Sequence, residues 1–101
     1  MNDIQTAVEN ELTRANEIYG ERFNSPHEAY AVILEEFEEA VEGMSTIEND
    51  IDDFWIMVKN VRTPETMRNT IGHLKRTAEN TAMELVQVAA MCKKALASMK
   101  E

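Results

Sequence analysis

The sequence contains few of the residues that interrupt helices or cross-link chains. Its 101 residues include three glycines, two prolines and one cysteine. Because a single cysteine forms no internal disulfide, we exclude a disulfide-stabilised scaffold and expect a reducing, cytoplasmic location. No stretch has the length and apolar character of a membrane span or a secretory signal, so we expect no membrane partner. A glycine-rich phosphate loop and a cysteine–histidine cluster for zinc are also missing.

Positive charge is scarce and lies mostly in the second part of the chain. Residues 1–58 hold 15 acidic residues against two basic ones, whereas residues 59–101 hold eight basic residues against four acidic ones. A duplex nucleic-acid partner requires a basic footprint, so we exclude one. An acidic cluster facing a basic segment suits a metal ion with a phosphate ligand. Solubility and internal charge balance are the simpler explanation of the same pattern.

Apolar residues recur at helical spacing along the whole chain, and no strand-like alternation of useful length is present. Start and stop signals divide this pattern into four predicted helices, at about 3–19, 26–43, 46–61 and 64–99. Gly20 ends the first helix, because glycine is the preferred residue just after a helix. Ser25-Pro26 and Thr63-Pro64 each place an N-cap residue before a proline suited to the first helical position.

The boundary between the second and third predicted helices rests on two signals. Gly43 weakens the end of one helix, and Ser45-Thr46-Ile47-Glu48 has the form of a capping box that starts another. The predicted fold is therefore an all-α four-helix bundle in a single domain over residues 1–101. Because so short a chain buries only part of its apolar surface, we expect a homodimer or homotetramer to complete the core.

The stretch LEEFEEA, residues 34–40, contains four glutamates that do not share one environment. Residues three apart on a helix are neighbours, so Glu36 and Glu39 present two carboxylates in one direction among small or apolar residues. Glu35, Glu38 and Glu42 fall on another face, which is typical of a solvated surface.

A further glutamate, Glu84, is embedded in the most apolar part of the chain, AENTAMELVQVAAMCKKAL. A carboxylate there is costly to bury alone and must be paired, hydrogen-bonded, protonated or bound to a metal. A hydrogen-bonded core glutamate and a metal ligand both remain open from the pattern alone. Asp50 and Asp53 form another pair, but their place near the start of the predicted third helix is explained by the helix dipole.

Taken together, these segments resemble the MazG-like, all-α nucleoside triphosphate pyrophosphohydrolases, and in particular a phage- and prophage-associated branch. That family carries an EExxE motif on one helix and an ExxD motif on a later one. Residues 35–39, EEFEE, match the first motif, and residues 84–87, ELVQ, match the second except that Gln87 replaces the aspartate. The resemblance covers residues of about 25–97.

The resemblance implies hydrolysis of a (d)NTP to a (d)NMP and pyrophosphate, with Mg²⁺, or Mn²⁺ in its place, held by glutamates. By this carry-over Glu36, Glu39 and Glu84 are the catalytic metal ligands, with Glu35 and Gln87 as further candidates. Magnesium prefers carboxylate, phosphate and water oxygens, which agrees with this assignment. The location implied for a phage-encoded chain is the cytoplasm of the bacterial host.

Substrate contacts are candidates among basic, amide and aromatic side chains, although a solvated surface role for the basic residues and a packing role for the tryptophan are the favoured interpretations. The candidates are Asn80, Lys59, Lys75, Arg76 and Trp55. Because Gln87 brings no negative charge and is no useful base, a second hypothesis is a nucleotide-binding or sequestering protein without turnover. A third is a helical bundle that only binds other proteins.

Overall fold

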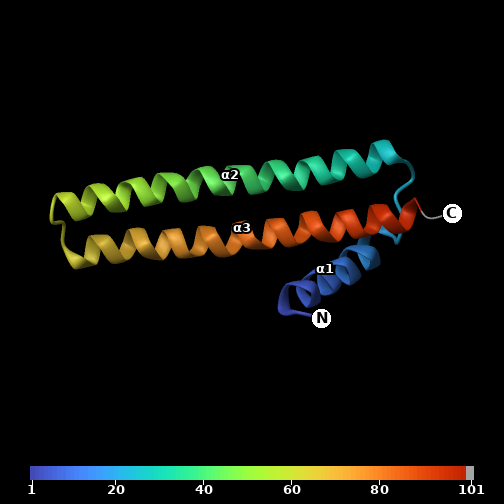
Figure 1. Cartoon of the computed structure of the whole chain (residues 1–101), viewed down its shortest axis with the longest axis horizontal. Helices are drawn as coiled ribbons and strands as arrows, with labels where there is room; N and C mark the ends of the chain where they lie inside the picture. The colour runs from blue at the N-terminus through green and yellow to red at the C-terminus, as the bar shows by residue number, and fades with distance from the viewer. Residues whose placement is uncertain (100–101) are drawn as a thin grey trace.

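The computed structural model describes residues 1–99, which form three α-helices joined by two short connections. The helices are α1 (Asp3–Tyr19), α2 (Pro26–Lys59) and α3 (Pro64–Ser98). Figure 1 shows α2 and α3 lying antiparallel as a long hairpin, while α1 packs against the C-terminal part of α3. The all-α prediction is confirmed. None of the described helices is both long enough and apolar enough to cross a membrane.

The predicted start and stop residues act at three of the helix ends. Gly20 follows α1 with a φ of 89°, a left-handed conformation that favours glycine. The Ser25 hydroxyl accepts a hydrogen bond from the Glu28 amide at 3.1 Å, and Thr63 caps α3 in the same way. In both caps the following proline occupies the first turn, where its missing amide hydrogen costs nothing.

The predicted division of residues 26–61 into two helices is wrong, and so is the count of four helices for the described residues. One continuous helix, α2, spans Pro26–Lys59. The Thr46 hydroxyl donates to the Glu42 carbonyl at 3.2 Å, inside the helix, instead of capping a new one. Gly43 marks a close approach to α3: a Cβ added there would overlap the Thr81 hydroxyl. The third glycine, Gly72, lies inside α3, which is continuous from Pro64 to Ser98.

The turn between α2 and α3 is a Schellman motif with an unusual residue at its left-handed position. The Arg62 amide donates to the Met57 carbonyl at 3.0 Å, and the Val61 amide donates to the Val58 carbonyl at 3.3 Å. Val61 has a φ of 50°, which a β-branched side chain adopts only under strain. This turn fixes the antiparallel pairing of the two long helices.

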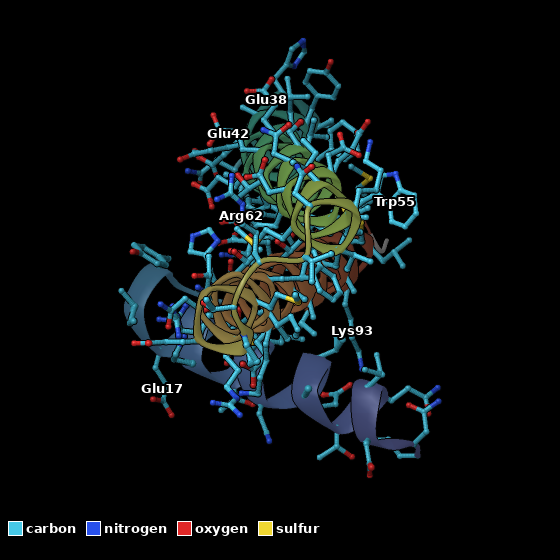
Figure 2. All side chains as sticks on the ribbon, turned by 90° about the vertical axis from the view of Figure 1, so that its left-hand side faces the viewer. Glu17, Glu38, Glu42, Trp55, Arg62 and Lys93 are labelled. Carbon is cyan, nitrogen blue, oxygen red and sulfur yellow. The ribbon has the colours of Figure 1, made fainter. Side chains whose placement is uncertain are left out.

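The chain is elongated, and its core is confined to one end. Its extents are 61 × 27 × 21 Å and its radius of gyration is 17.8 Å, against about 13 Å for a compact chain of this length. The cluster of buried residues joins α1 to α3 through Ala15, Ala90 and Met91. Towards the turn, large apolar side chains stay exposed; Trp55, labelled in Figure 2, is 59% exposed.

Candidate metal centre

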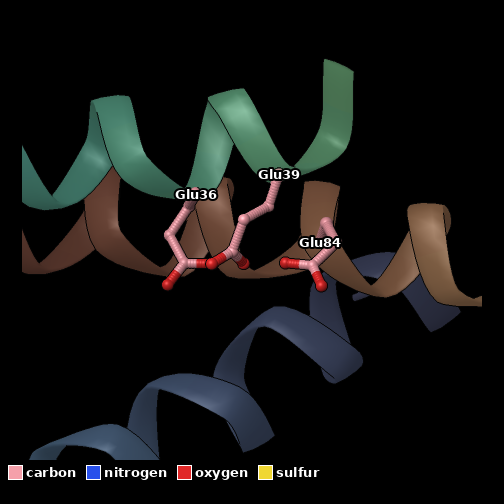
Figure 3. A group of neighbouring side chains, drawn as sticks. All are labelled: Glu36, Glu39 and Glu84. Carbon is pink, nitrogen blue, oxygen red and sulfur yellow. The ribbon is translucent and has the colours of Figure 1, made fainter. Parts of the chain in front are cut away.

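Three glutamates from two helices converge where the hairpin passes α1. Glu36 and Glu39 project from α2, and Glu84 projects from α3 towards them (Figure 3). Each offers a carboxylate oxygen, and these three oxygens lie within 4.8 Å of one another. Oxygens that share one Mg²⁺ or Ca²⁺ ion at 2.0–2.6 Å lie no more than about 4–5 Å apart. The spacing of the three oxygens is therefore within the range for one Ca²⁺ ion, and a shared Mg²⁺ ion requires the side chains to move closer together.

Small residues bring the two helices close enough for this convergence. Ala40, directly after Glu39, is 3% exposed, and Gly43 lies one helical turn further along α2. Gly43 faces Thr81, whose hydroxyl donates to the Thr77 carbonyl at 2.7 Å and so stays close to its own helix. Thr81 precedes Glu84 by one turn on α3, and Gly43 follows Glu39 by one turn on α2. The close approach of the two helices at Gly43 and Thr81 therefore sets the distance between the Glu39 and Glu84 carboxylates.

The cluster is electrostatically unfavourable without a cation. Burial raises the pKa of Glu36, and the negative charges of Glu39 and Glu35 raise it further. The pKa of Glu39 is also raised, first by its hydrogen-bonding contact with Glu84 and then by the charge of Glu84. Raised pKa values in neighbouring carboxyl groups mean that each resists ionisation beside the others. A divalent cation or a shared proton would relieve this repulsion.

Gln87 completes the cluster, one turn after Glu84 on α3. With its amide nitrogen turned towards the carboxylates, Gln87 donates to Glu84 Oε2 at 2.8 Å and to Glu36 Oε2 at 2.9 Å. With the amide rotated by a half turn, its carbonyl oxygen faces the same atoms and offers a neutral metal ligand. Gln87 can therefore either donate hydrogen bonds to the carboxylates or offer its oxygen to a bound cation.

A cleft of about 560 Å³ opens beside Glu36 and Gln87. α3 packs against both α1 and α2, and the cleft is lined by all three helices and by the α1–α2 connection. The three helices and the connection each contribute charged or amide side chains to the lining, which are Glu11, Arg14, Arg22, Asn24, Glu28, Glu35, Glu36, Gln87 and Lys94. The cleft is large enough for a small ligand.

Sequence reasoning missed the contribution of α1. Glu11 is 6% exposed and forms a two-pronged ion pair with Arg14, at 2.6 and 3.0 Å. The hydrogen bonds from Arg14 lower the pKa of Glu11, and a contact with Gln87 lowers it further. A signal was present in the sequence, because Glu11 occupies a position between Val8 and Ala15 on the apolar stripe of the helix.

Sequence reasoning also missed Lys94, which lies near the other end of the cleft. Lys94 is 4% exposed, and its ammonium lies 4.6 Å from the centre of the Phe23 ring. It forms no ion pair and no side-chain hydrogen bond with any other residue of 1–99. Its position in an apolar stripe, two turns after Gln87, was the available signal.

Most of the predicted substrate-contact residues lie apart from the cluster within one chain, whereas Asn80 is one turn from Glu84 on α3. Trp55 and Lys59 are near the turn, where the Lys59 ammonium lies 5.6 Å from the Trp55 ring centre; Lys59 is about 30 Å along α2 from Glu39. Lys75 pairs with Glu79 at 3.0 Å. Arg76 and Asn80 precede Glu84 on α3 by about 12 and 6 Å along the axis.

Other acidic residues also have clear placements. Glu35 is exposed and lines the cleft beside Glu36, whereas Glu38 and Glu42 project from α2 away from the other helices (Figure 2). Asp50 does not join the cluster, because it pairs with His73 at 2.6 Å further along the hairpin.

Comparisons of the chain with protein-family models, with curated proteins and with solved structures found no match.

Proposed function

We propose that the chain binds Mg²⁺ through Glu36, Glu39 and Glu84 and hydrolyses a nucleoside triphosphate to a monophosphate and pyrophosphate. The observation that carries the proposal is the convergence of three carboxylate oxygens within 4.8 Å from two helices. The cleft beside them supports it, because it offers space and three basic side chains, those of Arg14, Arg22 and Lys94. The resemblance of the EEFEE and ELVQ motifs to the MazG-like family agrees with this reaction.

The chemistry follows from the placement of the carboxylates. Bound Mg²⁺ would neutralise phosphate charge and polarise the attacking water. Water attacks the α-phosphorus, its bond to the α–β bridging oxygen breaks, and pyrophosphate leaves with the electron pair. Glu39 is the exposed member of the cluster, and the oxygen that it does not give to the metal would take the proton from this water. Glu36 and Glu84 fix the geometry from opposite helices.

A second candidate function is nucleotide binding without turnover, and Gln87 is the observation that favours it. The amide touches both Glu36 and Glu84, so it occupies the place of a ligand without adding negative charge. A cluster with three carboxylates holds its cation more weakly than one with four. Under this alternative the protein sequesters a metal-bound nucleotide and releases it intact.

Pyrophosphate release distinguishes the two functions. The purified protein is incubated with each (d)NTP and Mg²⁺ or Mn²⁺, and pyrophosphate is measured. Glu36→Gln and Glu84→Gln should each reduce the rate at least a hundredfold, the scale of losing one stabilising group of a transition state. Glu38→Gln is the matched control, because it removes the same charge from a face away from the cluster, and it should leave the rate unchanged.

Loss of activity in the control as well would show that general charge, rather than the cluster, matters. Calorimetric binding of a nucleotide without pyrophosphate release would select the second function. In that case Gln87→Asp, which restores a carboxylate, should strengthen Mn²⁺ binding and test whether charge is what turnover lacks.

A second copy of this chain is the protein partner that best fits the exposed apolar surface. The chain exposes 7395 Å², against about 5,800 Å² for a compact monomer of its mass. The excess is larger than the roughly 800 Å² that each partner buries in a standard interface. Val41, Met44, Ile47 and Ile51 line a shallow groove on α2 that such a copy would cover.

A further inference from the structure

Lys94 is a buried cation without a charged partner among residues 1–99. The nearby basic side chains differ from it: Arg14 pairs with Glu11 and Lys93 pairs with Glu9, whereas Arg22 is exposed and donates to the Ala97 carbonyl. Lys94 has only the face of the Phe23 ring beneath its ammonium. A buried ammonium loses the favourable free energy of its hydration. Contact with an aromatic face compensates part of that free energy, and contact with an anion would compensate more. The structure therefore keeps a cation at the cleft that its own carboxylates do not neutralise.

The surroundings hold Lys94 in place rather than leaving it mobile. The Phe23 amide donates to the Ser98 hydroxyl at 2.8 Å, and that hydroxyl donates to the Lys94 carbonyl at 2.8 Å. The Arg22 guanidinium donates to the Ala97 carbonyl at 3.0 Å. These bonds fasten the α1–α2 connection to the end of α3 and so keep Phe23 close to the Lys94 ammonium. A preorganised cation binds an anion at lower entropic cost than a free surface lysine.

Lys94 and the carboxylate cluster share one face of α3. Gln87, Met91 and Lys94 follow a spacing of four and three residues, and all three line the cleft. The Cα atoms of Gln87 and Lys94 are about 10 Å apart along the helix axis. The Lys94 ammonium lies over the Phe23 ring, and both residues line the cleft. The cleft thus joins Glu36 and Gln87 of the carboxylate cluster to the buried Lys94.

We propose that Lys94 binds a phosphate group of the metal-bound nucleotide, so that the ligand bridges from the carboxylate cluster to this lysine. The proposal rests on the proposed function, because it needs a polyanion that the cation at Glu36, Glu39 and Glu84 anchors. Lys94 is a better anion ligand than Arg14, whose donors are used by Glu11. The exposed Arg22 supplies a second, weaker contact from the rim.

The test measures binding of inorganic triphosphate in the presence of Mg²⁺ by calorimetry. Lys94→Met keeps the apolar stem against Phe23 and removes the charge, and it should weaken binding about ten- to a hundredfold, the scale of one charge-assisted hydrogen bond. Lys93→Met is the matched control, because it removes the same charge from the adjacent residue, outside the cleft. It should bind triphosphate like the unaltered protein.

Three results overturn the proposal: equal binding by Lys94→Met and the unaltered protein, equal weakening by Lys93→Met, or no triphosphate binding by the unaltered protein. If Lys94→Met does not fold, Lys94→Gln takes its place and carries the same expectation. Binding of Mn²⁺ alone separates this proposal from the one that it rests on. Lys94→Met should leave Mn²⁺ affinity unchanged, whereas absence of any Mn²⁺ binding in the unaltered protein contradicts the metal site itself.

Discussion

Gly43→Ala tests whether α2 and α3 approach as closely as the carboxylate cluster requires. The added Cβ would overlap the Thr81 hydroxyl and lie 3.0 Å from Thr81 Cβ. Replacing glycine by alanine inside a helix normally stabilises it by about 1 kcal/mol. Overpacking a filled site costs about 1–3 kcal/mol. Thr81 is 4% exposed and bonded to its own helix, so it yields little space. We expect a net loss of up to about 2 kcal/mol.

Urea denaturation at one protein concentration measures this change. Gly72→Ala is the matched control, because its Cβ would meet only Arg76 Nη1, at 3.6 Å; it should stabilise the chain by about 1 kcal/mol. Thr81→Ala removes the overlapping hydroxyl, so the double variant should recover much of the loss, with a coupling energy of about 0.5–3 kcal/mol.

The same substitution should affect the cluster. Gly43 and Thr81 each lie within about one turn of a cluster glutamate, so a wider crossing separates Glu39 from Glu84 and lowers Mn²⁺ affinity. If Gly43→Ala stabilises the protein as much as Gly72→Ala does, the helices are not in close contact at this point. The reasoning that derives the metal site from this crossing would then be refuted.

Three further predictions concern the charges, the turn and the exposed surface. The raised pKa values of Glu36 and Glu39 mean that these two groups hold more protons in the folded than in the unfolded protein, so their contribution to metal-free stability should fall as pH rises through those values, opposite in sign to that of Glu11. Melting in a chelator from pH 4 to 8 checks this by comparison with Glu39→Gln, in which the loss of stability with rising pH should be smaller. Val61→Gly should stabilise the chain by about 1 kcal/mol in urea titrations, because it relieves the left-handed strain; no gain would contradict that strain. Trp55 fluorescence should shift to the red as the protein is diluted and a second copy dissociates, whereas a concentration-independent spectrum and a monomeric sedimentation mass would exclude that interface.

The sequence was sufficient to predict the helical class, most helix ends and the three cluster glutamates. A helix cap such as Ser25-Pro26 depends on residues within a few positions of it, so it can be predicted from the sequence without knowledge of the fold. Glu36 and Glu39 lie one turn apart, and Glu84 stood out as a carboxylate in an apolar stretch; the structure brings the three together. These are properties of single helices and their periodicity.

The errors and omissions all depend on contacts between helices. Gly43 has the local signal of a helix end, but in the structure it lies inside α2 and allows the close approach of Thr81. Glu11 and Lys94 were overlooked because the value of a buried charge depends on which side chains face it from other elements. Lys59 and Trp55 illustrate the converse, since suitable chemistry in the sequence does not place a residue near the cluster in one chain.

The most direct test of the account is the thermal response of the protein to Mn²⁺ or Mg²⁺ in comparison with two single variants. A cation that binds only the folded state raises the melting temperature in proportion to its concentration over its dissociation constant. We expect a clear rise for the unaltered protein and for Glu38→Gln, and none for Glu36→Gln. An absent response in the unaltered protein, or an equal response in all three, would contradict a metal centre formed by Glu36, Glu39 and Glu84.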